Sequence, residues 1–448
     1  MKNYIKIEKK IKSFNKKILV SGDKSISIRC VLLASQAIGK SRIYNLLDSE
    51  DVISSLNAIK KLGINFKKFK DFYEIYGYGL NGYKTKRKIT INAGNSGTLA
   101  RLILGLLVNS ENQIKLVGDK SLSKRDFLRV REPLERFGAK LSSKKNKLPL
   151  KITGSNYLRP IRYFEKLGSA QCKSSAMLAA IKTPGTTSIV AKKSRNHTEL
   201  LFKNLKIPIK IIHKRNYDYI EIKGQSNYKG FDYKIPGDIS SCSFFLVLTL
   251  LSSKSKLIIK DVNINKTRTG IITILNKMNA NILLKNKRKY KGELISDILV
   301  KSNDQIKSIN CNQKLNSSAI DEFLVIFLVA ARAEGVSKFY NLSELNKKES
   351  PRLDIAISFL KKIGIKVLRN NNDIKIFGNP ELKLNGNYII KDFKKDHRVF
   401  MMSCIAALVF GGKWKIHDKN STNTSFPKFF NIIKKLGGKL NWRKEKIL

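Results

Sequence analysis

The sequence lacks the cysteine and histidine patterns that metal and redox sites require. Its five cysteines form no CxxC pair, and its four histidines lie far apart. Four of the cysteines lie in polar clusters or in the apolar segments after them, where a reduced thiol behaves as a small hydrophobic side chain. We therefore expect no metal site and no cofactor.

Long hydrophobic runs are also missing. The longest apolar stretches include Phe244–Leu251 and Phe323–Ala331, which fall well short of the roughly 20 residues of a membrane span. The start, MKNYIKIEKKIKSF, has no apolar run of the kind found in signal peptides. We expect a soluble protein of a reducing compartment, the cytoplasm, with no membrane partner.

Acidic residues are scarce relative to basic ones. The chain has 34 Asp and Glu against 88 Lys and Arg, which gives a formal net charge of +54. Such a charge suits a nucleic acid, an anionic membrane or acidic small substrates as partner. The lysines are dispersed along the whole chain, and the abundance of Lys, Asn and Ile is also what AT-rich codon usage produces. The charge therefore does not identify a function.

What the chain does contain is a repeat. Six polar or charged clusters, each followed by a nearly unbroken apolar segment, recur 69 to 84 residues apart. An apolar segment without a polar face predicts a buried helix. Each cluster lies where such a helix would begin, so its unpaired backbone N–H groups would attract anions. The clusters begin at Gly22, Gly94, Gly168, Gly237, Asp321 and Asp396.

Each apolar segment is followed by a short alternating strand, an amphipathic helix that often ends at glycine, and further strands. At 448 residues the chain is expected to form two or three domains. Three repeats that pack their buried helices together would make one domain, so six would make two similar domains. We expect one domain over residues 21–235 and the other over 1–20 plus 236–448. The first strand, within Ile5–Val20, lacks a cluster and is placed with the last three repeats.

Ten short strings carry a resemblance to a known family. They occur in the order seen in 5-enolpyruvylshikimate-3-phosphate synthase, and the similarity covers nearly the whole chain. Each string is weak alone, but ten in the right order are specific. The strings are GDKSISIR, NLLDSEDV, GNSGTLAR, GSAQCKS, SRNHTE, PGDISS, IDEF, KKESPR, DHRV and TSFP.

The resemblance implies an α/β fold of two domains. Each domain would have three βαβαββ units around buried parallel helices, an inside-out α/β barrel, with the active site in the interdomain cleft. The implied reaction transfers enolpyruvyl from phosphoenolpyruvate to the 5-hydroxyl of shikimate-3-phosphate and releases phosphate, in chorismate and aromatic amino-acid biosynthesis. The partners would be these two small anions and no nucleic acid, and the chain would be a monomer.

The resemblance assigns shikimate-3-phosphate mainly to the first three clusters. Arginine forks, lysine point charges and helix N-termini suit the several negative charges of the two substrates. The family usually has His or Asn at the position of Ile28, so a polar role is lost there. His197 is expected to make a structural hydrogen bond. The assigned residues are Lys24, Ser25, Arg29, Ser169, Ala170, Gln171, Arg195, Asp321 and Lys348.

Phosphoenolpyruvate is assigned to residues of both halves of the chain. Asp126 follows Arg125 where the family often has proline, and this carboxylate is expected to compete for Arg125. Glyphosate-tolerant relatives commonly carry alanine at the position of Gly97, so we expect glyphosate to inhibit this protein. The assigned residues are Lys24, Asn95, Gly97, Arg125, Gln171, Arg352 and Arg398.

The resemblance names Asp321, Glu349 and Lys24 as catalytic. Asp321 would accept the proton of the 5-hydroxyl, Glu349 would move the proton at the methylene carbon of phosphoenolpyruvate, and Lys24 would lie near both substrates. Ser350 is expected to cap a helix whose first residue is Pro351.

Three further positions are interpreted as structural. Asp396 and His397 are expected to order the turn before Arg398, and Asp238 to lie at a hinge or a helix start. A lysine of the enteric branch corresponds to Thr424, so no catalytic lysine is assigned there.

Three alternatives remain. The sister transferase acting on UDP-N-acetylglucosamine typically uses a loop cysteine near residue 115, whereas this chain has no cysteine between Cys30 and Cys172. RNA 3′-phosphate cyclase uses a catalytic histidine and a nucleotide, and lacks the KES and DHR strings. A nonspecific nucleic-acid-binding protein fits the charge, but the basic residues are dispersed and no RNP-like or zinc motif is present.

Overall fold

The computed structural model describes residues 3–84 and 88–444. Residues 1–2 and 445–448, which the sequence analysis placed in the second domain, lie outside the described residues, as do residues 85–87.

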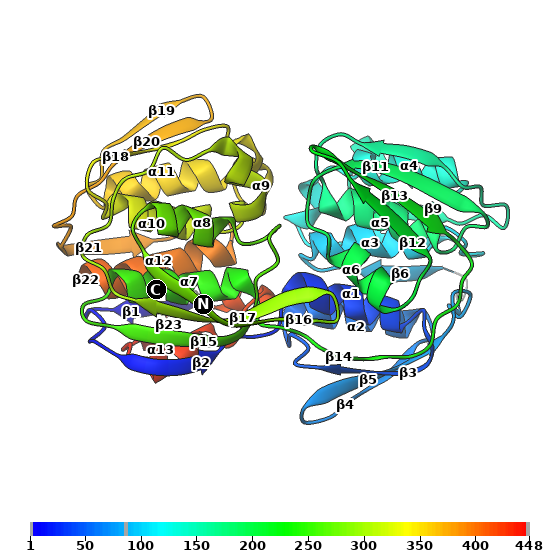
Figure 1. Cartoon of the computed structure of the whole chain (residues 1–448), viewed down its shortest axis with the longest axis horizontal. Helices are drawn as coiled ribbons and strands as arrows, with labels where there is room; N and C mark the ends of the chain where they lie inside the picture. Colours follow the sequence, from blue (N-terminus) through cyan, green and yellow to red (C-terminus); the bar gives the residue numbers. More distant parts are fainter. Residues whose placement is uncertain (1–2, 85–87, 445–448) are drawn as a thin grey trace. The chain divides into compact units, whose positions relative to one another are not determined.

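The chain divides into two compact units, drawn in Figure 1. The central unit comprises Gly22–Pro236 and the short segment Lys289–Glu293. The terminal unit comprises Met1–Ser21, Gly237–Arg288 and Leu294–Leu448. Pro236 and residues 289–293, expected in the domain of 1–20 plus 236–448, therefore belong to the central unit, and Ser21, expected in the domain of 21–235, belongs to the terminal unit.

Each repeat has one helix that is buried on every side. Most of their residues are apolar, polar ones such as Arg29 and Lys173 are buried with them, and the six helices predicted from the sequence are confirmed. No helix among residues 3–84 and 88–444 is long and apolar enough to cross a membrane. The buried helices are α1 (Lys24–Ala34), α3 (Gly97–Leu106) and α5 (Ala170–Ala180) in the central unit, and α7 (Ile239–Leu251), α10 (Phe323–Ala331) and α12 (His397–Phe410) in the terminal unit.

Neighbouring buried helices of one unit begin at the same end. Gln171, in the first turn of α5, donates to Thr98 in the first turn of α3 at 3.0 Å. Ser240, in the first turn of α7, donates to Glu322, just before α10, at 2.5 Å. The polar clusters of a unit are therefore gathered at one end of its helix core.

Three four-stranded sheets surround the helices of the central unit, and all three share one strand order. In the order in which the strands lie side by side, the first pairs in parallel with the second, and the third pairs antiparallel with both the second and the fourth. Helices inside and separate sheets outside confirm the expected fold class. The sheets are β14 (Asp232–Lys234), β3 (Ile38–Tyr44), β5 (Phe72–Tyr78), β4 (Asn65–Lys68); β6 (Ile89–Asn92), β7 (Ile114–Val117), β9 (Leu150–Thr153), β8 (Lys140–Ser143); and β10 (Arg162–Glu165), β11 (Thr186–Lys192), β13 (Tyr217–Lys223), β12 (Ile209–His213).

The terminal unit follows the same plan, with the N-terminal strands completing two of its sheets. The single strand expected within Ile5–Val20 is in fact two strands in different sheets. Each pairs with strands more than two hundred residues away. The sheets are β16 (Asn281–Tyr290), β17 (Glu293–Lys301), β15 (Lys256–Asn263), β2 (Asn15–Leu19); β21 (Leu384–Ile390), β22 (Gly411–His417), β1 (Asn3–Ile7), β23 (Asn441–Lys444); and the three-stranded β18 (Val336–Phe339), β20 (Asp373–Phe377), β19 (Val367–Asn370).

Amphipathic helices complete the repeats. Four were predicted from segments that end at glycine: α2 (Glu50–Lys61), α4 (Leu128–Phe137), α11 (Arg352–Lys362) and α13 (Phe429–Lys435). The predicted repeat also calls for an amphipathic helix in the third and fourth repeats, where α6 (His197–Asn204) and α8 (Gly270–Lys277) lie, but the sequence analysis gave no position for them and did not identify α9 (Asn316–Ala319). Short 3-10 turns lie at Leu122–Lys124, Lys144–Asn146, Gln313–Leu315, Ser343–Lys347 and Lys419–Thr424.

Candidate active site

Side-chain caps fix the starts of five buried helices. In each, an oxygen of the residue before the first turn accepts a backbone N–H that has no partner within the helix. The start of α10 differs, because Glu322 precedes it without capping it. The clusters are thus rigid platforms from which the next side chains project. The capping residues are Asp23, Ser96, Ser169, Asp238 and Asp396.

Arg29 ties α1 to two other helices of the central unit. Its Nε donates to Thr198 Oγ1 at 2.8 Å and its Nη2 to Ser174 Oγ at 2.9 Å, while Nη1 donates to the carbonyl of Ser25 at 3.0 Å. The side chain is buried. The predicted substrate residues Ser25 and Arg29 therefore lie together, but Arg29 is anchored by protein oxygens on three of its nitrogens.

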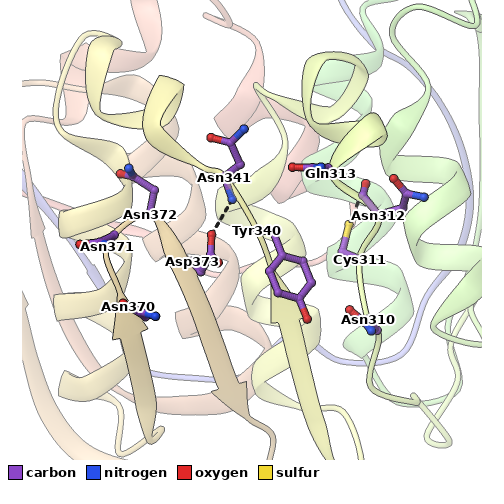
Figure 2. Close-up of a pocket in the computed structure, with 10 residues that line it drawn as sticks. All are labelled: Asn310, Cys311, Asn312, Gln313, Tyr340, Asn341, Asn370, Asn371, Asn372 and Asp373. Carbon is purple, nitrogen blue, oxygen red and sulfur yellow. Dashed lines mark hydrogen bonds between the residues drawn. The ribbon is translucent and has the colours of Figure 1, made fainter.

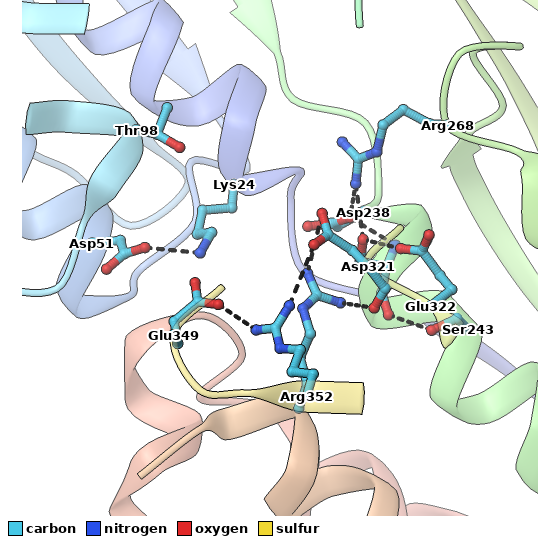
Figure 3. Close-up of polar contacts among 12 residues, drawn as sticks. Lys24, Asp51, Thr98, Asp238, Ser243, Arg268, Asp321, Glu322, Glu349 and Arg352 are labelled. Atoms are coloured by element: carbon cyan, nitrogen blue, oxygen red, sulfur yellow. Dashed lines mark hydrogen bonds and ion pairs between the residues drawn. The ribbon is translucent and has the colours of Figure 1, made fainter. Parts of the chain in front are cut away.

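Lys24, in the first turn of α1, forms an ion pair with Asp51 of α2 at 2.8 Å (Figure 3). Lys24 keeps about a fifth of its side-chain surface accessible, at 18%. The sequence analysis gave Asp51 no role, although its string NLLDSEDV was part of the resemblance. An acidic residue in the first turn of a helix that faces a cation is the signal that was available.

Arg101, on α3, orders the start of α5. Its Nη1 donates to Gln171 Oε1 at 3.0 Å, and Gln171 in turn donates to Thr98. The guanidinium lies 5.1 Å from the Phe127 ring centroid. Burial lowers the pKa of Arg101 to about 10. The predicted contact residue Gln171 is thus held between α3 and α5.

Arg125 and Asn95 are brought together as predicted residues of one site. Arg125 Nη2 donates to Asn95 Oδ1 at 3.1 Å, and Asn95 Nδ2 donates to Asp119 Oδ2 at 2.6 Å. The carboxylate of Asp126 accepts the backbone N–H of Leu128 at 2.6 Å, so it is occupied by the start of α4.

Gly97 is in close contact with two guanidinium groups. A Cβ atom built on Gly97 would lie 2.7 Å from Arg125 Nη1 and 2.8 Å from Arg101 Nη1. Both distances are shorter than side chains normally tolerate, so any larger residue must displace these arginines. Glycine here sets the position of the cations.

The start of α5 and the loop before α6 hold the remaining predicted residues of the central unit. Ser169 caps α5, and its own N–H donates to Glu165 Oε2 at 2.9 Å. Ala170 is the first residue of α5, and Arg195, half-buried, lies two residues before α6. Burial raises the pKa of Glu165.

Arg352 is the centre of the polar cluster in the terminal unit. It lies at the start of α11, is 1% exposed, and contacts three carboxylates, of which Asp321 and Glu349 are labelled in Figure 3. Its Nε donates to Asp396 Oδ2 at 2.9 Å, its Nη2 to Glu349 Oε2 at 2.5 Å, and its Nη1 lies 3.5 Å from Asp321 Oδ1. Burial alone would lower the pKa of Arg352, but the three carboxylates outweigh it and raise that pKa.

Asp396 is fully buried beneath this cluster. Burial disfavours its charged form, yet the Arg352 guanidinium holds the pKa of Asp396 below its usual value. Asp396 also accepts from Ser350 Oγ at 2.8 Å and caps α12. The prediction that Asp396 orders this turn is confirmed.

The prediction about Ser350 and Pro351 was wrong by one position. Pro351 is the capping residue and α11 begins at Arg352. Ser350 gives its hydroxyl to Asp396 rather than to the helix start. Lys348 and Glu349 lie on the preceding loop, as expected.

Arg398, in the first turn of α12, completes the cluster around Asp321. Its Nη1 donates to the Asp321 carbonyl at 2.8 Å, and its Nη2 lies 3.8 Å from Asp321 Oδ2. Asp321 thus lies between the guanidinium groups of Arg352 and Arg398.

A second buried network in the terminal unit was missed. Arg268 Nη2 donates to Asp238 Oδ1 at 3.1 Å (Figure 3) and to Ser240 Oγ at 2.9 Å. Ser240 in turn donates to Glu322. Asp238 caps α7, which confirms its predicted place at a helix start. Because Glu322 precedes α10 directly, this network fixes the chain next to Asp321.

A polar cavity elsewhere in the terminal unit does not match the predicted chemistry. It has a volume of about 720 Å³, and none of its ten lining residues is a lysine or an arginine (Figure 2). Asp373 in its wall accepts the N–H of Asn341 at 2.8 Å. The lining residues are Asn310, Cys311, Asn312, Gln313, Tyr340, Asn341, Asn370, Asn371, Asn372 and Asp373.

Comparison with known proteins identifies the family. Residues 8–433 match the family model described as EPSP synthase (3-phosphoshikimate 1-carboxyvinyltransferase). The chain belongs to the EPSP synthase family. A 3-phosphoshikimate 1-carboxyvinyltransferase of Ruthia magnifica subsp. Calyptogena magnifica is 38% identical over 94% of this chain and 95% of its own length. One of Thermodesulfovibrio yellowstonii is 37% identical over 96% of this chain and 99% of its own length.

Solved structures agree with this family. EPSP synthase from Acinetobacter baumannii is similar with a TM-score of 0.87 and 32% identity, covering 99% of this chain and 100% of that one. The enolpyruvyl transferase NikO from Streptomyces tendae has a TM-score of 0.77 at 14% identity, again over 99% and 100%. NikO supports the fold alone. The match to EPSP synthases also decides against the sister transferase and the cyclase that the sequence left as alternatives.

Proposed function

We propose that this chain transfers the enolpyruvyl group of phosphoenolpyruvate to the 5-hydroxyl of shikimate-3-phosphate and releases phosphate. As a member of the EPSP synthase family, it is a transferase of the shikimate pathway and of aromatic amino-acid biosynthesis. The observation that carries the residue assignment is the cluster of Asp321 and Glu349 around Arg352 and Arg398, because it joins acid–base groups to anion-binding groups at the same helix starts.

Asp321 is proposed as the group that accepts the proton of the 5-hydroxyl. A neighbouring guanidinium favours the anionic form of a carboxylate, and Asp321 has two of them within 4 Å. An anion is the form that a general base needs. General acid–base catalysis of this kind typically contributes ~10²–10⁴-fold to the rate.

Glu349 is proposed to move the proton at the methylene carbon of phosphoenolpyruvate. Its Oε2 occupies Arg352 Nη2, the nitrogen that a substrate carboxylate would also use. For Arg352 to bind that carboxylate, Glu349 must give up this contact. Binding of phosphoenolpyruvate would thereby release Glu349 for proton transfer.

The central unit is proposed to supply most contacts to shikimate-3-phosphate. Lys24, in the accessible first turn of α1, is proposed to lie near both substrates and to assist catalysis. The proposed shikimate-3-phosphate residues are Lys24, Ser25, Arg29, Ser169, Ala170, Gln171 and Arg195, with Asp321 and Lys348 from the terminal unit.

Phosphoenolpyruvate is proposed to use cations from both units. In the central unit, Asn95 and Gly97 place Arg125, as described above. The proposed residues are Lys24, Asn95, Gly97, Arg125, Gln171, Arg352 and Arg398.

Phosphate release from the two substrates tests this proposal. Wild type should release phosphate only when both are present, and Asp321→Ala and Glu349→Ala should lose ~10²–10⁴-fold in kcat. Glu344→Ala is the matched control, because Glu344 lies on the same loop in an exposed ion pair with Lys347. No release by wild type would refute the function. Equal rates for all three variants would refute the assigned roles.

We further propose that the protein works in the cytoplasm as a monomer without nucleic acid. Light scattering should give the mass of one chain. The two substrates together should raise the melting temperature more than duplex DNA does, and stabilisation by DNA alone would contradict the proposal.

A further inference from the structure

The hairpin of β16 and β17 has its tip in the central unit. Its strands Asn281–Tyr290 and Glu293–Lys301 lie mostly in the terminal unit, whereas Lys289–Glu293 belongs to the central unit. The two turn residues, Lys291 and Gly292, both have positive φ, of 46° and 91°. This is the tight two-residue turn whose twist suits a hairpin.

The tip is packed into the central unit by specific contacts. Tyr290 OH accepts the N–H of Lys234 at 3.0 Å, and its ring meets that of Tyr233 edge-on at 5.6 Å. A Cβ on Gly292 would lie 3.4 Å from Leu200 of α6, so the turn lies directly against that helix. The tip is therefore a fixed part of the central unit.

Glu293 makes the most deeply buried contact of the tip. Its Oε1 lies 2.6 Å from Nδ1 of His197, the first residue of α6, and both residues are 0% exposed. A buried carboxylate is costly unless a partner satisfies it, so this pair strongly favours one position for His197. The expectation that His197 makes a structural hydrogen bond is confirmed.

His197 lies between two residues that matter for the proposed shikimate-3-phosphate site. Arg195 precedes it by two positions. Thr198 follows it, accepts from Arg29 Nε at 2.8 Å and shares a hydrogen bond of 2.7 Å with Ser174. A shift of His197 must therefore move both Arg195 and the acceptor that holds Arg29.

Glu293 also acts near α1. Burial first, and then the charge of Glu293, raise the pKa of Cys30, the neighbour of Arg29 in α1. The carboxylate therefore lies at the start of α6 and also acts electrostatically on the middle of α1.

We infer that Glu293 is a positioning residue for shikimate-3-phosphate: through His197 it holds the start of α6, and thereby Arg195 and Arg29, in the geometry that binds this substrate. The inference rests on the proposed function. Because Arg29 and Arg195 are proposed for shikimate-3-phosphate and not for phosphoenolpyruvate, the effect should fall on shikimate-3-phosphate rather than on phosphoenolpyruvate or on the proton transfers.

The test compares Glu293→Ala with Tyr290→Phe, which removes another hydrogen bond of the same tip but leaves His197 untouched. Glu293→Ala should weaken calorimetric binding of shikimate-3-phosphate and raise its KM by about tenfold or more. The kcat and the KM for phosphoenolpyruvate at saturating shikimate-3-phosphate should change less than about threefold. Tyr290→Phe should bind like wild type, and Glu293→Gln, which can still hydrogen-bond His197, should recover part of the loss.

If the wild type is active, two outcomes would overturn the inference. One is wild-type affinity for shikimate-3-phosphate in Glu293→Ala. The other is an equal loss in Glu293→Ala and Tyr290→Phe, which would indicate a general loosening of the tip. If Glu293→Ala does not fold, Glu293→Gln is compared with Tyr290→Phe by the same criteria. An inactive wild type would instead refute the proposed function.

Discussion

The two units hold their site cations in different ways. In the central unit, the hydrogen bonds described for Arg29, Arg101 and Arg125 run to hydroxyl, amide and carbonyl oxygens. In the terminal unit, Arg352 and Arg398 face carboxylates. The acceptors described for the central unit are neutral, whereas those of the terminal unit are carboxylates that share the charge of the arginines.

This difference fits the proton-transfer carboxylates proposed for the terminal unit, where Arg352 and Arg398 are also proposed to bind phosphoenolpyruvate. A binding group needs orientation without loss of charge, and neutral acceptors supply that. A proton-transfer group needs a carboxylate whose ionisation is controlled by its neighbours, and paired arginines supply that. Lys24, which pairs with Asp51, is the exception within the central unit.

The largest expected difference between the units is the loss of stability when one arginine is removed from each. Arg352→Met leaves the buried Asp396 without its cation, which we expect to lower the free energy of unfolding by ~3–5 kcal/mol. Arg29→Met should cost only ~1–3 kcal/mol, because Thr198 and Ser174 still hydrogen-bond each other. For Arg352→Met, the free energy of unfolding is measured by tryptophan fluorescence in chemical denaturant, because both tryptophans, Trp414 and Trp442, lie in the terminal unit. For Arg29→Met, the loss of stability is measured by scanning calorimetry. Equal losses of stability in the two variants would contradict the difference between the units.

The ion pair of Arg352 and Asp396 should also make the stability of the protein depend on acidic pH. Arg352 depresses the pKa of Asp396, so the stabilisation by this pair is complete above the usual carboxylate pKa of about 3.9 and is lost as the pH falls below it. The difference in unfolding free energy between wild type and Arg352→Met should therefore narrow below about pH 4. Tryptophan fluorescence in denaturant at a series of pH values measures this. A gap that stays constant down to pH 3 would contradict it.

In the central unit, Lys182 should instead make the stability of the protein depend on pH in the alkaline range. Burial lowers the pKa of Lys182 to about 7, and its ammonium donates to the Leu80 carbonyl and lies 5.2 Å from the Tyr83 ring centroid. Above pH 7 the unfolded chain binds a proton that the folded chain does not, so stability should rise by ~1.4 kcal/mol per pH unit toward pH 10.

Lys182→Met should abolish that rise, since methionine fills the space without a titratable group. Calorimetry of both proteins between pH 7 and 9 measures it. Lys289→Met, a surface substitution, serves as the control for a general charge effect. Parallel profiles for wild type and Lys182→Met would show that Lys182 stays charged.

Much of the fold was predictable because its signal is local. Segments such as Phe244–Leu251 are apolar on all sides, which indicates a buried element, and the repeat of the polar clusters before them predicted all six as helices. The residues at the helix starts followed from the same clusters together with the family resemblance. The short helices α6 and α8 have eight residues each, too few for a clear periodic pattern.

The buried polar contacts of the site could not be predicted, because they depend on partners that are distant in sequence. KKESPR has the composition of a solvated loop, yet Arg352 is buried because Asp396, 44 residues away, meets it. Likewise Glu293 lies in a basic, apparently exposed hairpin, and only His197, 96 residues earlier, explains its burial. No local pattern indicates such pairs.

Gly97 offers the finest test of the difference between the units. Alanine there must displace Arg125 and Arg101, whose guanidinium groups are ends of flexible side chains and can move without disturbing the core. We therefore expect Gly97→Ala to keep wild-type thermal stability but to raise the KM for phosphoenolpyruvate by about fivefold, or ~1 kcal/mol. Glyphosate should inhibit the wild type and inhibit the variant less. Gly386→Ala, at an exposed site where a Cβ meets only ordinary contacts, is the control. Loss of thermal stability in Gly97→Ala would show that Arg125 and Arg101 cannot move aside without disturbing the core. Wild-type binding of both phosphoenolpyruvate and glyphosate would show that the position of these arginines does not control binding.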